Sequence, residues 1–343
     1  MRAARLHPGE SRLRIEDVPA PGATGDQVVV RVVGAGVCHS DLHLLDGMFA
    51  EMMRLPVTMG HEIAGRVEAV GPNVRDLEPG APVVVMVGWG CGHCRWCVSG
   101  HEQLCPAGNE AGATVDGGFA ERVLVPHRRH VVPLGSLDPL EASPFGCAAL
   151  CSYAAVKRVR SLLGGGSSFV VIGIGGLGQY GVQFARRLTG AEVIAVDLEA
   201  RRLERARALG ADHGVLAGIG AADEIRELTS GSGADAVIDF VGTDDTLALA
   251  GRVVGSRGQV ALLGLAGGAI PFSFSSLAPE ASLTTVVAGT VLDLQEVVRI
   301  AQTGRLVAEL ETYPLDAINQ ALDDLRAGKI AGRAVITPQG ESP

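Results

Sequence analysis

Seven cysteines divide into a compact group of four and three scattered residues. The compact group falls within fifteen residues and consists of Cys91, Cys94, Cys97 and Cys105. Four thiolates satisfy a tetrahedral zinc ion completely, so this spacing predicts a closed, structural zinc site in a lobe at about residues 90–106. Scattered Cys and His residues can instead build a second site with one coordination position left open for substrate.

Two short polar segments hold candidate ligands for that second site. Cys38 lies in Cys-His-Ser-Asp-Leu-His, and His61 lies in Gly-His-Glu. With one downstream cysteine they would supply the three protein ligands that a catalytic zinc takes. Cys147 and Cys151 compete for the third place, because residues four apart share a helix face. A lone buried cysteine is also a common core residue, so the residues alone leave this choice open.

A glycine pattern in the second half of the chain predicts a dinucleotide site. An apolar run reads as a strand, and G-x-G-x-x-G follows it as Gly173, Gly175 and Gly178 at the start of a helix. These glycines permit a tight turn, approach of the backbone to a pyrophosphate and close packing of helix on strand. Free N–H groups at the helix start then bind the anion. Gly176 and Leu177 complete the loop and are also cofactor-binding candidates.

Asp197 turns this pattern into a prediction of NAD. The glycines alone also fit a simple tight turn, but Asp197 ends the next apolar strand, 19 residues after Gly178. A carboxylate there accepts hydrogen bonds from the adenosine ribose and repels the 2′-phosphate of NADP. Arg201 and Arg202 follow closely and can soften that repulsion, although both also fit a solvated helix face. We retain Arg202 as a cofactor-binding candidate.

The elements that must position these residues change in kind near Ser152. Before it, short β-branched runs bounded by Gly or Pro predict an irregular β domain. After it, apolar runs alternate with helical patterns, which predicts βαβ units around a parallel sheet. The end of the chain predicts two helices, over residues 292–303 and 315–327, and a strand over residues 333–337. A length of 343 residues suits two domains.

Composition argues against several classes of function. The net charge is −9 and no basic run occurs, which disfavours nucleic-acid binding. No apolar stretch approaches about 18 residues, and the first residues lack the apolar region of a signal peptide, so we expect a cytoplasmic protein without membrane contact. In that compartment, C-x-x-C spacing favours metal ligation over disulfides.

Together these motifs closely resemble those of the zinc-dependent medium-chain alcohol dehydrogenases, over essentially the whole chain. The similarity lies in Gly36–Asp41, Gly60–Glu62, the four-cysteine lobe, the glycine pattern and Asp197. The resemblance implies an NAD-dependent oxidoreductase acting on CH–OH groups, with two zinc ions per subunit. It also implies that the protein forms a homo-oligomer, either a homodimer or a homotetramer.

The resemblance further implies an α/β fold with two domains. One is a GroES-like, β-rich catalytic domain, which comprises residues 1–152 and, because the C-terminal segment returns to it, residues 292–343. The other is a Rossmann NAD-binding domain with a doubly wound parallel sheet, residues 153–291.

Residue roles follow from the same resemblance. Cys147 becomes the third ligand of the catalytic zinc with Cys38 and His61, and Cys151 stays outside the site. Ser40 accepts the proton of the alcohol and passes it through the cofactor ribose to His43.

Four further residues receive supporting roles. The resemblance places His39 and Arg333 at the cofactor pyrophosphate. It makes Asp41 the carboxylate that orients the metal-binding imidazole. Glu62 lies behind the metal, either as a transient ligand during ligand exchange or as a buried core carboxylate.

The substrate prediction rests on apolar residues. Phe49, Trp89 and Phe119 fit pocket walls or plain core, and no Arg/Lys cluster accompanies them. We therefore expect reversible oxidation of a hydrophobic primary or secondary alcohol to an aldehyde or ketone. The alternatives are a polyol or threonine dehydrogenase, and a biosynthetic reductase of C=C or imine bonds on the same scaffold.

Overall fold

The computed structural model describes residues 1–304 and 306–339. The chain divides into two compact units, the first Met1–Leu150 with Ala288–Pro343 and the second Cys151–Val287. The boundaries that the sequence predicts, after residues 152 and 291, lie two and four residues further along the chain than these divisions. Within the described residues, every helix is too short or too polar to span a lipid bilayer.

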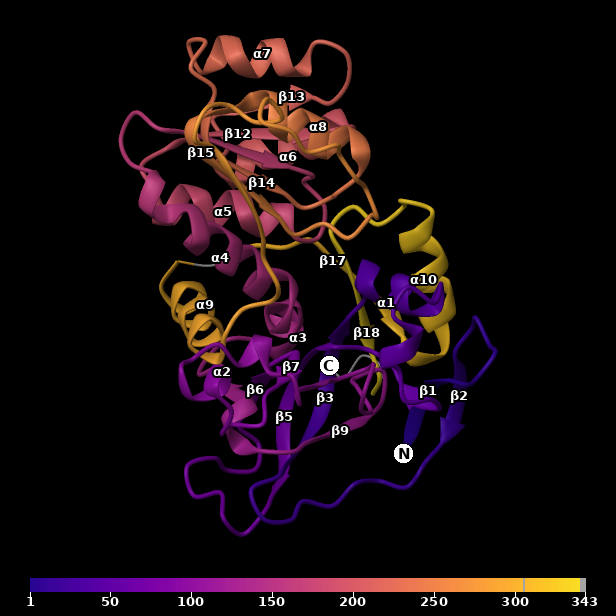
Figure 1. Ribbon diagram of the computed structural model, residues 1–343. Coiled ribbons are helices and arrows are strands. Elements are labelled where there is room, and N and C mark those ends of the chain that lie inside the picture. Colours follow the sequence, from indigo (N-terminus) through magenta and orange to yellow (C-terminus); the bar gives the residue numbers. More distant parts are fainter. Residues whose placement is uncertain (305, 340–343) are drawn as a thin grey trace. The chain divides into compact units, whose positions relative to one another are not determined.

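The first unit is built on a seven-stranded sheet whose strands come from both ends of the chain. The order is β10-β6-β5-β3-β18-β17, and β9 also pairs with β3. The strands are β3 (Val28–Gly36), β5 (Glu62–Val70), β6 (Pro82–Val85), β9 (Arg122–Val125), β10 (Val131–Pro133), β17 (Leu310–Pro314) and β18 (Arg333–Thr337). Strand β18 pairs antiparallel with β3, with Val335 opposite Gly36, so the returning chain completes the sheet (Figure 1).

Short elements surround this sheet. The remaining strands of the unit are β1 (Arg2–Leu6), β2 (Arg14–Asp17), β4 (Val57–Thr58), β7 (Gly88–Trp89) and β8 (Asn109–Glu110). Its helices are α1 (His39–Leu45), α2 (Arg95–Val98), α3 (Pro139–Ala142), α9 (Val291–Gly304) and α10 (Ile318–Arg326). The two predicted C-terminal helices and the final strand are therefore present as α9, α10 and β18.

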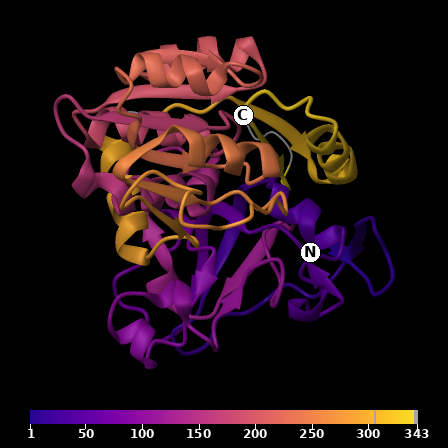
Figure 2. The ribbon, with the colours of Figure 1, turned by 45° about the horizontal axis from the view of Figure 1, so that its top comes forward.

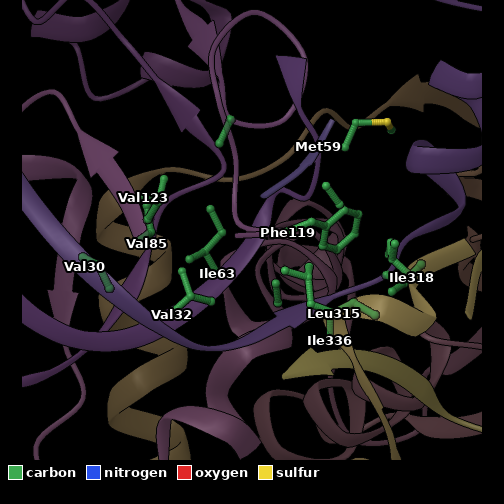
Figure 3. Close-up of a cluster of buried hydrophobic side chains, with 14 of the residues drawn as sticks. Val30, Val32, Met59, Ile63, Val85, Phe119, Val123, Leu315, Ile318 and Ile336 are labelled. Carbon is green, nitrogen blue, oxygen red and sulfur yellow. The ribbon is translucent and has the colours of Figure 1, made fainter. Parts of the chain in front are cut away.

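An apolar cluster fills the interior of the first unit. Val30 and Val32 of β3 are completely buried while Arg31 between them is exposed, as the two-residue period of a strand dictates. Figure 3 shows these valines with Ile63 of β5 and with Ile318 from the returning segment. The core therefore joins distant parts of the chain, and it holds the strands whose ends carry the candidate ligands.

Helix α10 secures helix α1, which carries several candidate site residues. The two helices pack together, and Figure 2 shows yellow α10 beside the indigo N-terminal part of the chain. Leu42 and Leu44 on α1 and Leu322 on α10 are buried in the same core cluster. Arg326 donates two hydrogen bonds of 2.8 Å to the Asp46 carboxylate just after α1. The apolar contacts supply most of the stability, because an exposed ion pair contributes little.

The second unit is a parallel sheet with the strand order of nucleotide-binding folds. The six strands are β11 (Ser168–Ile172), β12 (Glu192–Asp197), β13 (His213–Leu216), β14 (Ala234–Asp239), β15 (Val254–Leu262) and β16 (Ser282–Thr285). They lie in the order β13-β12-β11-β14-β15-β16, and every pair is parallel. The order reverses between β11 and β14, which is the switch point at which such sheets bind ligands.

Helices connect and cover these strands. They are α5 (Gly178–Leu188), α6 (Ala200–Leu209), α7 (Ala221–Leu228) and α8 (Asp244–Val253), while α4 (Ala148–Val159) contains the first division between the units. Helices α5 and α6 pack on β11 to β13, and α8 packs on β14 and β15. The predicted fold class, α/β with a β-rich unit and a Rossmann-type parallel sheet, is confirmed.

Candidate functional site

Four ligand-bearing side chains converge inside the first unit. They are Cys38, His61, Glu62 and Cys147, whose ligand atoms all lie within 4.8 Å of one another. Cys38 stands between β3 and α1, His61 and Glu62 stand at the start of β5, and Cys147 precedes α4. The exposed fractions of Cys38 and His61 are 5% and 2%. Two thiolates and an imidazole at this spacing suit zinc, and the three predicted ligands are thus brought together.

Asp41 fixes the entry to α1 and faces the imidazole. Its Oδ2 accepts a 2.8 Å hydrogen bond from the Cys38 backbone N–H. Its Oδ1 lies 3.3 Å from His61 Nδ1, and both side chains are buried. Nδ1 of His61 therefore faces a carboxylate, which leaves Nε2 as the ring nitrogen for a metal.

Glu62 is held in a buried ion pair with Arg333. Arg333 Nε donates to Glu62 Oε2 at 2.8 Å, its Nη2 pairs with Oε1, and the Ala148 N–H also donates to Oε1 at 3.1 Å. Gly36 makes room for this carboxylate, since a Cβ there would lie 2.0 Å from Glu62 Oε2. The structure thus places Arg333 beside the candidate metal ligands, and the pyrophosphate contact expected of it stays a prediction.

The ionisable groups of this cluster shift one another. A hydrogen bond with Cys147, aided by the charge of Arg333, holds the pKa of the Cys38 thiol well below its usual range despite burial. Burial opposes the charged form of His61, but Asp41 and Cys38 raise the pKa of the imidazole well above its usual range. A thiolate beside a protonated ring is an arrangement in which a metal cation can replace the proton.

Helix α1 carries the predicted proton-relay residues close to the cluster. Ser40 Oγ lies 3.8 Å from Cys38 Sγ. His43, one turn further along, shares the same helix face, and its buried Nδ1 has no hydrogen-bond partner within the described residues. His39, predicted to contact the pyrophosphate, is exposed. The helix therefore presents a hydroxyl at the cluster and an imidazole with a ring nitrogen available.

The four clustered cysteines have the geometry of a closed zinc site. Sγ of Cys91 lies 3.9 Å from Sγ of Cys97, and Sγ of Cys94 lies 3.8 Å from Sγ of Cys105. Tetrahedral zinc with bonds of about 2.3 Å places its sulfurs about 3.8 Å apart. Backbone N–H groups of His93 and Cys94 lower the pKa of the Cys91 thiol to about 6, which favours the thiolate that zinc binds.

The glycine loop has the shape that a pyrophosphate site needs. Gly173 has a φ of 85°, which favours glycine. A Cβ on Gly178 would lie 1.9 Å from the Gly173 carbonyl oxygen, so only glycine lets α5 approach β11. At Gly175 a Cβ would meet nothing within 4 Å, which leaves that backbone open to a ligand. Gly176 and Leu177 lie between Gly175 and Gly178, immediately before α5.

Asp197 ends β12 next to this loop. Its Oδ2 accepts a 2.7 Å hydrogen bond from the Ile174 N–H, and its Oδ1 accepts one of 3.0 Å from Glu199. Arg202 lies 3.8 Å from the Asp197 carboxylate and 3.1 Å from that of Glu199. Two carboxylates therefore offset the charge of Arg202, which favours NAD over a cofactor with an additional phosphate.

Sequence reasoning missed two residues near the metal cluster. Gly36 was noticed only as the start of a motif, although the space it leaves decides where Glu62 sits. Glu110 was not singled out, because a single acidic residue after the cysteine lobe carries no spacing signal. Among the proposed pocket walls, Phe119 is completely buried in the core cluster, which favours its core role.

Two family models match the chain. "Alcohol dehydrogenase GroES-like domain" matches residues 24–136, and "Zinc-binding dehydrogenase" matches residues 176–303. The first match covers both metal clusters except Cys147, and the second covers most of the parallel-sheet unit. The GroES-like identity predicted for the β-rich unit is thereby confirmed.

Known proteins resemble the chain over its whole length. An NAD-dependent alcohol dehydrogenase of Sulfurisphaera tokodaii is 36% identical, covering 98% of this chain and 100% of the relative. A D-arabinose 1-dehydrogenase (NADP(+)) of Saccharolobus solfataricus is 35% identical, with 98% and 97% covered. The crystal structure of the alcohol dehydrogenase of Aeropyrum pernix matches with a TM-score of 0.92 and 37% identity, over 98% of this chain and 100% of that one.

Replacing Gly178 with Ala should destabilise the second unit, whereas replacing Gly175 should not. The Gly178 substitution forces a Cβ against a backbone oxygen and should cost about 1–3 kcal/mol. The matched Gly175→Ala variant should unfold in urea like the wild type but bind NAD more weakly, as measured by calorimetry. Equal stability of the two variants would contradict the close contact at Gly178.

Replacing Cys94 with Ser should remove one zinc per subunit and leave the other. Elemental analysis should give about one zinc instead of about two, and the thermal unfolding temperature should fall, because structural zinc supplies folding free energy. Cys38→Ser is the matched variant, which should also lose one zinc but should keep the lobe stable against proteolysis. Retention of two zinc ions by either variant would refute the assignment of its cluster.

Proposed function

The chain belongs to the zinc-dependent medium-chain alcohol dehydrogenase family, and on that premise we propose that it oxidises a hydrophobic primary or secondary alcohol to an aldehyde or ketone with NAD. The observation that carries this proposal is the buried cluster of Cys38, His61 and Cys147 with the Ser40 hydroxyl beside it. The relatives named as NAD-dependent alcohol dehydrogenases support it over their full length. The reverse reaction would reduce the carbonyl compound.

The residues of the first unit would hold the substrate hydroxyl and take its proton. Zinc bound by the two thiolates and the imidazole supplies Lewis acidity, and NAD bound at the glycine loop supplies the hydride acceptor. Asp41 keeps the His61 ring in place through its Nδ1 side. Ser40 Oγ accepts the proton of the hydroxyl, because it is the hydroxyl group that lies beside Cys38.

His43 is the proposed destination of that proton. It lies three residues after Ser40 on the same helix face, and its Nδ1, which has no hydrogen-bond partner in the described part of the chain, can accept a proton. The presence of both residues favours alcohol chemistry over the C=C or imine reductase alternative, which would need no relay.

Glu62 is proposed to support the cluster and not to bind the metal at rest. Its two oxygens already accept from Arg333 and from the Ala148 N–H. Burial raises the pKa of its carboxyl while the Arg333 charge opposes the rise. Ligation of the metal by Glu62 would have to break this ion pair, so such ligation stays a prediction.

A homo-oligomeric state and a cytoplasmic location also stay predictions.

The proposed function is tested by turnover and metal content together. Purified enzyme should reduce NAD with aliphatic, benzylic and terpenoid alcohols and contain about two zinc ions per subunit. Ser40→Ala should lower kcat by about 10²- to 10⁴-fold, the range of general acid–base contributions, and Ser40→Thr should retain activity because it keeps the hydroxyl. Normal turnover by Ser40→Ala would remove Ser40 from the relay.

Replacing Asp197 with Asn should relax the preference for NAD over NADP. The amide removes the negative charge while its oxygen can still accept from the Ile174 N–H, so the fold should survive. The ratio of kcat/KM for the two cofactors should shift by about tenfold or more, since charge repulsion of the 2′-phosphate is lost. An unchanged ratio would mean that the ribose contact is misassigned.

A further inference from the structure

Glu110 carries a carboxylate that has no partner among the described residues. It lies in β8, and its backbone is fixed, since its N–H donates to Thr114 Oγ1 at 2.8 Å and its carbonyl accepts from the Thr114 N–H at 3.0 Å. The side chain is partly buried, yet across residues 1–304 and 306–339 no hydrogen bond or ion pair reaches its carboxylate. Removing a carboxylate from water without giving it a partner is unfavourable, so a contribution to folding stability does not explain why a glutamate occupies this position.

The position of Glu110 connects it with the metal cluster. The chain after β8 presses on the segment that carries His61: a Cβ on Gly112 would lie 2.8 Å from the nitrogen of Gly60, the residue before that ligand. The charges of His61, Asp41 and Cys38 act on the Glu110 carboxyl. Glu110 therefore lies within electrostatic range of the place where the alcohol must bind.

The chemistry of this carboxyl suits a hydroxyl group. Burial raises the pKa of Glu110, and the charge of His61 opposes that rise. As an anion the group accepts a hydrogen bond, and as a neutral acid it can donate one as well. A hydroxyl is both donor and acceptor, so it can pair with either form, whereas a methylene group can pair with neither.

We propose that Glu110 determines substrate specificity by hydrogen-bonding a second hydroxyl of the alcohol that is oxidised at the Cys38–His61–Cys147 cluster. The inference rests on the proposed NAD-dependent alcohol oxidation and changes its expected substrate from a purely hydrophobic alcohol to one that carries a second hydroxyl near the reacting one. Glu110 is then the polar pocket group that a diol or polyol substrate requires. A polar group built to pair with a hydroxyl discriminates strongly against an analogue that lacks it, because the group is then left without a partner.

The test compares 1-butanol with 1,2-, 1,3- and 1,4-butanediol in wild type, Glu110→Leu and Glu110→Gln, using NAD reduction to obtain kcat/KM. In the wild type the best diol should exceed 1-butanol, and in Glu110→Leu this ratio should fall by about tenfold or more. Glu110→Gln should retain most of the ratio, because its amide still hydrogen-bonds a hydroxyl. Zinc content and thermal unfolding are measured on all three proteins.

Unfolding separates a specificity role from a structural one. Glu110→Leu should be as stable as the wild type or more stable, since it removes a partly buried carboxylate that pairs with none of the described residues. If Glu110→Leu is active and its diol-to-butanol ratio of kcat/KM is unchanged, the inference is overturned and the proposed function stands. This holds whether or not the unfolding temperature of the variant is lower. If the wild type oxidises neither these four alcohols nor the aliphatic, benzylic and terpenoid alcohols named above, the proposed function fails and this inference fails with it.

Discussion

The buried ion pair between Arg333 and Glu62 is the interaction on which the first unit, with its candidate metal cluster, depends. It joins the first residue of β18 to the first residue of β5, and Gly36 at the end of β3 leaves the space that the carboxylate fills. Removing one partner of a buried ion pair costs about 3–5 kcal/mol, because the remaining charge is left in a poorly solvated interior. The pair therefore ties three strand ends together at the point where Cys38 and His61 emerge.

The two cysteine-containing sites differ because of what surrounds their thiolates. In the lobe, short loops turn backbone N–H groups toward the sulfurs, as the Cys91 N–H does toward Cys105 Sγ at 3.3 Å, and sulfur supplies all four donors. In the buried cluster, the groups around the thiolates are side chains from separate elements, and the Ser40 hydroxyl lies beside Cys38 Sγ. The first arrangement is local and closed, and the second is assembled by the fold.

This difference explains how much could be predicted from the sequence. The lobe and the glycine loop could be predicted almost completely, because the residues that form each of them lie only a few positions apart in the sequence. The parallel sheet was also evident from apolar runs that alternate with helical patterns, and the apolar run that Asp197 ends is strand β12. Strand β17 was missed because Leu310–Pro314 is short, half polar and exists only by pairing with β18. The partner of Arg333 and the surroundings of Glu110 were invisible for the same reason, since both depend on contacts between segments remote in the chain.

The late position of β18 in the chain has a consequence for the order in which the protein matures. Arg333 and Glu62 are 271 residues apart, and the strand that brings Arg333 to the cluster follows the whole nucleotide-binding unit in the chain. During synthesis from the N-terminus, the cysteine lobe and the whole nucleotide-binding unit leave the ribosome before this arginine does. The lobe can thus acquire its metal on a growing chain, while the cluster of Cys38 and His61 gains its counter-charge only after the nucleotide-binding unit has been synthesised.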